Sequence, residues 1–145
     1  MQPVVKGFGG EFHFLSNFYP CEVEYQGLVY PSSEHAYQAA KVLCIEEKKE
    51  VAKLKTAAEA KKIGKTLDVR FDWPEIKLEV MLEIVRNKFN QNERLAEMLL
   101  ATEDLILEET NWWGDTFWGV CRGRGKNHLG KILMQVREEI RNARK

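Results

Sequence analysis

The sequence carries no excess of charge of either sign. Its 145 residues include 22 Lys and Arg against 22 Asp and Glu, which gives a formal net charge of zero. A balanced chain has no general electrostatic attraction to nucleic acid or to an anionic membrane surface. The composition therefore excludes binding that rests on bulk charge, although it is compatible with a local basic patch.

Long apolar runs, closely spaced cysteines and a signal-like N-terminus are also missing. No stretch is long enough to span a membrane as a helix, and the first residues, MQPVVKGFGG, lack the apolar segment of a secretory signal. Cys21, Cys44 and Cys121 are an odd number without a close pair, which predicts neither a disulfide framework nor a zinc site. We therefore expect a cytoplasmic protein without membrane association.

The remaining composition is typical of one globular domain. Hydrophobic residues make up 44% of the chain and charged residues 30%, and the length lies within the usual size of a single domain. We expect residues 1–145 to form one domain. Its predicted class is α+β and helix-dominated, with an N-terminal β-hairpin region followed by about six helices and a short strand.

The first elements follow from a change in apolar spacing. CEVEY and LVY flank Gln26 and Gly27, a pattern typical of a hairpin in which the glycine supplies the turn. Beyond Pro31 the spacing becomes helical, with Ser33 as the candidate N-cap. The apolar stripe of this helix is expected to contain Ala36, Ala39, Ala40 and Leu43. Further helices are predicted over 46–56, 57–65, 93–101 and 129–140, and a strand over 105–109.

A central helix is predicted from Asp72, an N-cap candidate, to about Phe89 or Asn90, with Pro74 in its first turn. Lys88 falls inside its apolar arc, where lysines are rarely buried without a partner or a task. Lys77 lies at nearly the same angle around the helix axis as Lys88, three turns earlier. The pattern alone therefore favours the alternative that these lysines extend past the edge of the core to solvent. The arc is formed by Ile76, Leu78, Val80, Met81, Leu82, Ile84, Val85 and Phe89.

Glu34 lies in the first turn of the helix that follows Ser33. Unpaired backbone N–H groups and the helix dipole favour a negative charge there, so we expect this carboxylate to be ionised. Gln38 and Lys41 follow on the same side and form a polar stripe with it. The pattern alone favours a solvated helix face, in which Glu34 only begins the helix, over a functional carboxylate.

The segment 111–129, NWWGDTFWGVCRGRGKNHL, contains three of the four tryptophans and four glycines. We expect a long loop over 111–126, and loops of this length in small domains are usually functional or disordered. Indole rings suit the stacking of a base, while glycine backbone and basic side chains suit a phosphate, so a nucleotide-like ligand is one interpretation. The alternative is that Trp112, Trp113 and Trp118 only close the core over a long connection.

Several chemistries have no support in the sequence. His13, His35 and His128 lie far apart without a His-x-x-x-His pair, so neither a metal nor a cofactor is predicted. GRGKN lacks the full spacing of a phosphate loop, which argues against an ATPase, and no Gly-x-Ser-x-Gly elbow is present. Carboxylates, lysines and aromatic rings remain as candidate reactive groups.

Four separated motifs, which together extend over nearly the whole chain, carry a family resemblance. They are Phe14–Pro20 (FLSNFYP), Pro31–Lys41 (PSSEHAYQAAK), the Asp72-Trp73 entry of the central helix with its Asn87–Phe89 exit, and Asp115–Gly119 (DTFWG) followed by Gly125–Met134 (GKNHLGKILM). In order and spacing these motifs resemble the NADAR family, also called YbiA-like.

The resemblance implies a hydrolase of N-glycosidic bonds. Members of the family hydrolyse ribosylamino-pyrimidine phosphates, early intermediates of riboflavin biosynthesis, and others remove ADP-ribose from guanine bases in nucleic acid. By motif position, Glu34, Trp73 and Asp115 resemble the family's active-site residues, with Lys88, Trp118 and Asn127 as their neighbours. The expected substrate-binding residues are Asn17, Trp73, Trp118, Gly119, Arg122, Arg124, Lys126 and Asn127.

The basic residues of the last motif bear on the phosphate of such a substrate. Arg122 and Arg124 stand where the family often carries a glycine-rich stretch. With Lys126 and Asn127 they are expected to hold the phosphate end of the substrate. The expected partner is thus a ribosylamine phosphate or an ADP-ribosylated guanine, and nucleic acid enters only as a modified substrate.

Two mechanisms fit a ribosylamine. A desolvated Lys88 can exchange with the base amine and hold the sugar as a Schiff base before water releases it. Alternatively, Glu34 activates water, while Asp115, its pKa raised among tryptophan rings, protonates the departing amine. A third possibility from another class is a module that binds NAD or ADP-ribose without cleaving it.

Overall fold

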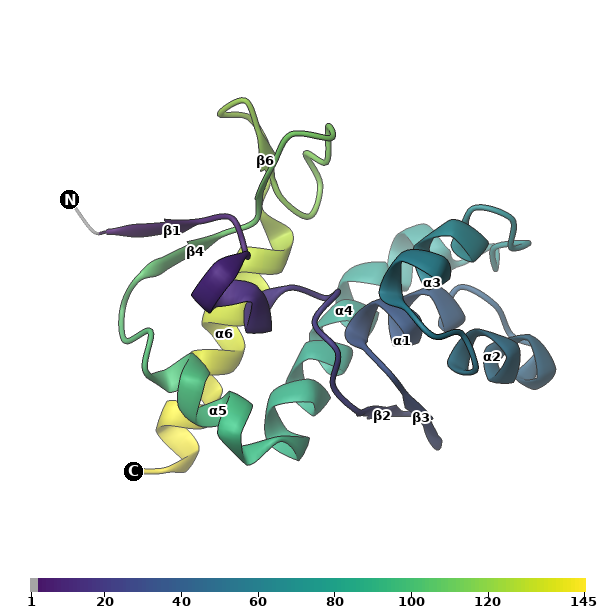
Figure 1. Ribbon diagram of the computed structural model, residues 1–145, viewed down its shortest axis with the longest axis horizontal. Helices are drawn as coiled ribbons and strands as arrows, with labels where there is room; N and C mark the ends of the chain where they lie inside the picture. Colours follow the sequence, from purple (N-terminus) through teal and green to yellow (C-terminus); the bar gives the residue numbers. More distant parts are fainter. Residues whose placement is uncertain (1–2) are drawn as a thin grey trace. The chain divides into compact units, whose positions relative to one another are not determined.

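The computed structural model describes residues 3–145 and has an α+β fold in which helices dominate, as predicted (Figure 1). The N-terminal elements are β1 (Val4–Lys6), the 3-10 helix η1 (Gly10–Leu15), β2 (Val23–Tyr25), β3 (Leu28–Tyr30) and α1 (Ser33–Ala39). The middle of the chain forms α2 (Ile45–Ala52), α3 (Ala57–Gly64), α4 (Trp73–Gln91) and α5 (Glu93–Leu100). The C-terminal elements are β4 (Ile106–Glu108), β5 (Thr110–Asn111), β6 (Val120–Cys121) and α6 (His128–Ala143).

The chain forms two compact units. One unit is continuous and contains residues 17–91, whereas the other combines residues 3–16 with residues 92–145. The single domain expected from the chain length stays a prediction.

The unit 17–91 begins with the predicted hairpin. β2 and β3 pair antiparallel with Tyr25 opposite Leu28, and the two turn residues, Gln26 and Gly27, have φ of 50° and 86°. Two left-handed residues in a row form the turn type that suits the twist of a two-residue hairpin, and glycine adopts this conformation without strain. The hairpin therefore follows from its own local sequence.

Helix α1 packs against α2, α3, α4 and β2. Its N-cap is Ser32 and not Ser33, because the hydroxyl of Ser32 accepts a hydrogen bond from the backbone N–H of His35 at 3.2 Å. The helix ends at Ala39, so Leu43 lies beyond it and is 68% exposed, contrary to the expected apolar stripe. Every residue of α1 is buried because neighbours surround it on several sides.

His35 links the start of α1 to the connection between α2 and α3. Its Nε2 lies 2.9 Å from the carbonyl oxygen of Leu54, and its Nδ1 lies 2.6 Å from the hydroxyl of Ser32. A carbonyl only accepts, so Nε2 carries the proton and Nδ1 accepts from the hydroxyl. Burial lowers the pKa of His35 below its ordinary value, and the ring is therefore held neutral.

Helix α4 begins directly after Asp72, as predicted, and ends at Gln91. Its buried face is narrower than the expected arc, since Leu78 is 41% exposed. The residues of α4 that are buried are Trp73, Val80, Met81, Ile84, Val85, Lys88 and Phe89. Helix α2 is present but ends at Ala52, four residues before the predicted end, and a capping box of Thr56 and Glu59 begins α3.

In the second unit, the strand predicted near residue 106 pairs parallel with the N-terminal strand, Val5 opposite Leu107. Helix α6 packs against β4 and α5, and its apolar face buries Leu133 and Val136 (Figure 1). The segment expected as a long loop is partly ordered as strand, because Asn111 of β5 pairs with Cys121 of β6. None of the helices within residues 3–145 combines the length and apolar character needed to cross a membrane.

Candidate functional site

Glu34 is a buried carboxylate, with 8% of its surface exposed. Its backbone N–H donates to the carbonyl oxygen of Asn17 at 3.0 Å, and Gln38 Nε2 donates to Glu34 Oε2 at 2.6 Å. Gln38 is 5% exposed, so the interpretation of this stripe as a solvated helix face is wrong for both side chains. A buried carboxylate retains its charge only where donors replace water, and Gln38 is such a donor.

Aromatic and basic side chains lie beside Glu34. Trp73, at the start of α4, is buried, and its ring centroid lies 5.2 Å from that of Tyr37. Lys41 Nζ lies 5.4 Å from the centroid of the Tyr37 ring. Burial lowers the pKa of Lys41, while the charge of Glu34 raises it and that of Lys77 lowers it. Glu34, Lys41 and the start of α4 thus share one electrostatic environment.

Tyr37 and Lys41 were not among the predicted site residues. A signal was present, since both lie within the motif Pro31–Lys41, three and seven residues after Glu34. These intervals place side chains along the same side of a helix as Glu34. Helical spacing did place Lys41 in one polar stripe with Glu34, although Lys41 lies just beyond the end of α1, and the same spacing would have found Tyr37.

Lys88 is fully within the interior of the protein. Its exposed fraction is 1%, and Nζ lies 5.1 Å from the centroid of the Phe89 ring and 5.8 Å from that of Tyr19. Burial lowers the pKa of Lys88 to about 8, partly offset by the nearby thiol of Cys21. The alternative that this lysine extends past the core edge is wrong. With a pKa near 8, the fraction of molecules that carry a neutral amine at physiological pH is far larger than for a solvated lysine.

Asn17 connects the two helices that carry these groups. Its carbonyl oxygen accepts from the N–H of Glu34, and its Nδ2 donates to Met81 Sδ at 3.5 Å. Met81 lies on the buried face of α4 two turns before Lys88. Among the predicted residues, the unit 17–91 thus contains Asn17, Glu34, Trp73 and Lys88.

Asp115 belongs to the other unit and is held in a tight turn. Its Oδ1 accepts from the backbone N–H groups of Phe117 at 3.1 Å and Trp118 at 2.9 Å. The Asn111 side chain bonds to both backbone groups of Asp115, accepting from its N–H at 3.0 Å and donating to its carbonyl oxygen at 2.8 Å. These bonds fix the direction of the carboxylate. No described residue donates to Oδ2, so this second oxygen stays available as an acceptor.

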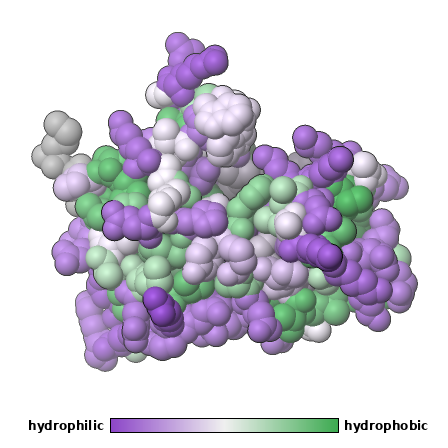
Figure 2. All heavy atoms as spheres, in the orientation of Figure 1, coloured by the Kyte–Doolittle hydropathy of each residue, from purple (hydrophilic) through white to green (hydrophobic). Residues whose placement is uncertain are grey.

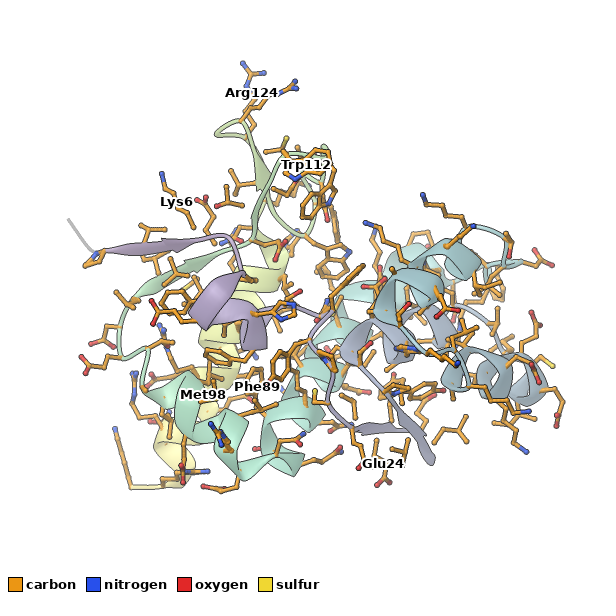
Figure 3. All side chains as sticks on the ribbon, in the orientation of Figure 1. Lys6, Glu24, Phe89, Met98, Trp112 and Arg124 are labelled. Atoms are coloured by element: carbon orange, nitrogen blue, oxygen red, sulfur yellow. The ribbon has the colours of Figure 1, made fainter. Side chains whose placement is uncertain are left out.

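The three tryptophans of this segment have different environments. Trp118 is half-buried, and its ring forms a T-shaped contact with Phe117 at 4.8 Å between centroids. Trp112 and Trp113 are 81% and 50% exposed, and their ring centroids lie 5.6 Å apart. The interpretation that all three only close the core is therefore wrong for Trp112 and Trp113, and Figure 3 labels Trp112.

The predicted phosphate-binding residues lie around a hairpin turn. Cys121 and Arg124 exchange two backbone hydrogen bonds, and Arg122 and Gly123 between them have φ of 54° and 76°. Arg122, Arg124 and Lys126 are exposed, and Figure 3 shows Arg124 at the tip of this turn. Figure 2 shows hydrophilic atoms covering the same tip. These cations are accessible to an anionic group from solvent.

Asn127 and Gly119 support this segment through the backbone. The side chain of Asn127 accepts from the N–H of Glu109 and donates to the carbonyl oxygen of Leu107, both at 2.9 Å. A Cβ added at Gly119 would overlap the carbonyl oxygen of Glu109 and lie 2.8 Å from Asn111 Nδ2. Both residues thus have structural tasks that the motif alone did not indicate.

Within residues 3–145, the structure contains no group of three or more His, Cys, Asp or Glu side chains arranged to hold a metal ion.

A model of the NADAR domain matches residues 7–141. The chain belongs to the NADAR family. The matched range runs through both units and includes every predicted site residue.

Relatives within the NADAR family include enzymes. The chain is 40% identical over 134 residues to an N-glycosidase of Nostoc punctiforme, covering 88% of this chain and 85% of that protein. It is 34% identical over 130 residues to the N-glycosidase YbiA of Escherichia coli, covering 87% of this chain and 80% of YbiA. The NMR structure of YbiA superposes with a TM-score of 0.86 at 31% identity, over 99% of this chain and 89% of YbiA.

A third relative is a longer protein. A riboflavin biosynthesis protein of Vibrio vulnificus is 46% identical over 130 residues, which cover 88% of this chain. The chain spans only 35% of that protein's length. The match therefore concerns one part of the Vibrio protein.

Proposed function

We propose that this NADAR protein is an N-glycosidase that hydrolyses the bond between ribose 5-phosphate and the exocyclic amine of a base. The substrate class proposed first is the ribosylamino-pyrimidine phosphates of riboflavin biosynthesis. Two relatives named N-glycosidases support the reaction class, and the name of the Vibrio relative supports the pathway. The free thiols of Cys21, Cys44 and Cys121 suit a reducing cytoplasm as the place of action.

The observation that carries the mechanism is the buried amine of Lys88, with its pKa lowered to about 8. A ribosylamine opens to an imine at C1. Neutral Nζ adds to C1, its two protons pass in turn to the base nitrogen, and the base leaves as a free amine while C1 and Nζ form the double bond of the Schiff base. Water then adds to C1 and displaces Nζ, which returns the free lysine and releases the sugar as its aldehyde.

Glu34 is proposed as the base of this reaction. Its carboxylate is buried yet bonded by Gln38, so it keeps an acceptor oxygen in a site of low dielectric, where proton transfer is effective. It would remove the proton from the sugar hydroxyl during ring opening or from the water that attacks C1. Trp73, beside Tyr37, is proposed to offer a stacking surface to the base.

Asp115 is proposed as a second carboxylate that turnover requires. Its Oδ1 is held by two backbone N–H groups, while Oδ2 stays available for a proton. If no Schiff base forms, the alternative is direct displacement by water, which needs one carboxylate as base and one carboxylic acid as proton donor. Arg122, Arg124 and Lys126 are proposed to bind the phosphate, because their side chains are exposed cations.

One observation favours a second function, removal of ADP-ribose from guanine in nucleic acid. Trp112 and Trp113 are exposed indoles on the segment that carries three exposed cations, a combination that suits stacked bases and a phosphate backbone. The balanced charge of the whole chain favours the smaller metabolite instead.

The test offers the purified protein three compounds: a ribosylamino-pyrimidine phosphate, ADP-ribosylated guanine in single-stranded DNA, and NAD. Mass spectrometry records the base released, and borohydride added during turnover reduces any imine to a stable adduct. We expect release from the first compound and an adduct on Lys88, absent in Lys88→Arg and retained in the control Lys77→Arg. Saturable binding of ADP-ribose without any release would instead identify a binding module.

A further inference from the structure

Gln38 has an unusual hydrogen-bond balance. Its Nε2 donates to Glu34 Oε2 at 2.6 Å, while its Oε1 is buried and accepts from no described residue. An unsatisfied buried acceptor costs stability, and an apolar side chain at this position would avoid that cost. Gln38 therefore costs stability at its Oε1, and the hydrogen bond that its side chain makes is the bond to Glu34.

The orientation of this amide follows from the charge of its partner. A carboxylate only accepts, so the NH2 group of Gln38 must face Glu34 and the carbonyl must face away. The bond then favours the ionised form of a carboxylate that burial would otherwise neutralise. Gln38 thus restrains the direction of the Glu34 carboxylate and favours its charged form.

Gly64 of α3 confines the amide from the other side. A Cβ added there would overlap Oε1 of Gln38 and would lie 2.5 Å from its Cδ and 3.2 Å from its Cγ. Gly64 is the last residue of α3, where alanine is a better helix former than glycine. The glycine is therefore explained by the close approach of Gln38, which cannot swing away from Glu34 in that direction.

We propose that Gln38 is a positioning residue that holds the carboxylate of Glu34 for proton transfer, with the backbone of Gly64 as the wall behind it. The inference rests on the proposed function, in which Glu34 is the base. Gln38 contacts no substrate in this role and acts only through Glu34.

The first test replaces the donor. Gln38→Met keeps the length of the side chain, and we expect kcat to fall about 10- to 100-fold, the loss of one hydrogen bond to a charged group. KM should change little. The acid limb of the kcat profile should move to higher pH, because Glu34 without its donor takes up a proton more readily. The matched control is Gln135→Met, which removes the same i,i+4 bond from an exposed pair, Gln135 Nε2 to Glu139 Oε2 at 3.1 Å.

The second test uses the wall. Gly64→Ala alone should lower kcat and Tm, because the methyl group displaces the amide. In the Gln38→Ala background the same change should cost nothing further, since the space is vacant, and Tm should rise with the better helix former. Equal losses in both backgrounds would show that Gly64 does not act through Gln38.

The outcomes separate the two proposals. A folded Gln38→Met protein with normal kcat and an unmoved acid limb, alongside an inactive Glu34→Gln protein, would overturn the role of Gln38 alone. A fully active Glu34→Gln protein would overturn Glu34 as the base, and the positioning role with it.

Discussion

Replacement of Lys88 by methionine should make the protein more stable and abolish its activity. Methionine matches the length of lysine and places no charge in the interior, where Lys88 is 1% exposed and lies beside the rings of Phe89 and Tyr19. This lysine lowers the free energy of unfolding, because burial opposes its charged form. Stability and catalysis therefore make opposite demands on one side chain.

The size of the effect follows from the pKa. Burial lowers the pKa of Lys88 from 10.5 to about 8, and at pH 7 this shift corresponds to about 3 kcal/mol of destabilisation. The sign is set by proton binding. Between pH 8 and 10.5 the unfolded chain holds a proton that the folded chain has lost, so the penalty is complete below pH 8 and disappears above 10.5. About one folded molecule in ten carries a neutral amine at pH 7, against about one in three thousand for a solvated lysine.

The assay is denaturant unfolding of wild type and Lys88→Met at pH 7, 9 and 10. The variant should be more stable at pH 7, and the difference in free energy of unfolding should shrink steadily as the pH rises. Lys77→Met is the control, because Lys77 lies on the same helix but is only half-buried. A stability difference that does not depend on pH would refute the electrostatic argument, and a variant with normal turnover would refute the Schiff base.

Three further predictions concern other groups. Wild-type stability should fall as the pH drops below 6.5, because burial lowers the pKa of His35 and the unfolded chain then takes up a proton that the folded chain does not. Urea midpoints measured at pH 7.5 and 5.5 test this. The variant His35→Gln should lose most of this pH dependence. Trp73→Ala should raise KM by about tenfold or more in steady-state kinetics, whereas Trp118→Ala with normal KM and a much lower Tm would show that Trp118 only packs. Turnover should be unaffected by a chelator, since imine and carboxylate chemistry need no metal, and recovery of lost activity by a divalent ion would contradict this.

The helices were predictable because their ends are set by local chemistry. Asp72 directly precedes α4, and α3 ends at Gly64, one residue before the predicted end at residue 65. The error at α1 was small and has a local cause. Ser32 and Ser33 are adjacent at the start of the helix, and the sequence alone does not decide which hydroxyl caps it.

The environment of Glu34 could not be predicted from its own helix. Spacing favoured a solvated face, yet α2, α3 and α4 surround α1 and bury it. The wall at Gly64 lies 26 residues from Gln38 along the chain, and such a pairing depends on how α3 packs. Lys88 was more predictable, because its own helix placed it inside an apolar arc.

The segment 111–129 was recognised as unusual, but its contacts were not predictable. Aromatic and glycine content does not reveal that Trp112 is exposed or that Trp118 is half-buried. The side chain of Asn127 bonds to backbone groups near residue 108, a partnership that depends on the tertiary arrangement. Composition thus identified the segment and left the role of each residue open.

The parallel pairing of β1 with β4 can form only late in synthesis, because β4 follows β1 by about a hundred residues along the chain. Val4 leaves the ribosome about 5 to 20 seconds before its partner Ile106, at ordinary rates of elongation. During that interval all of residues 17–91 have been made, so the continuous unit has its full sequence while the N-terminal strand still has no partner. A nascent chain stalled before residue 106 would therefore present β1 as an unpaired edge, available to chaperones or to other chains.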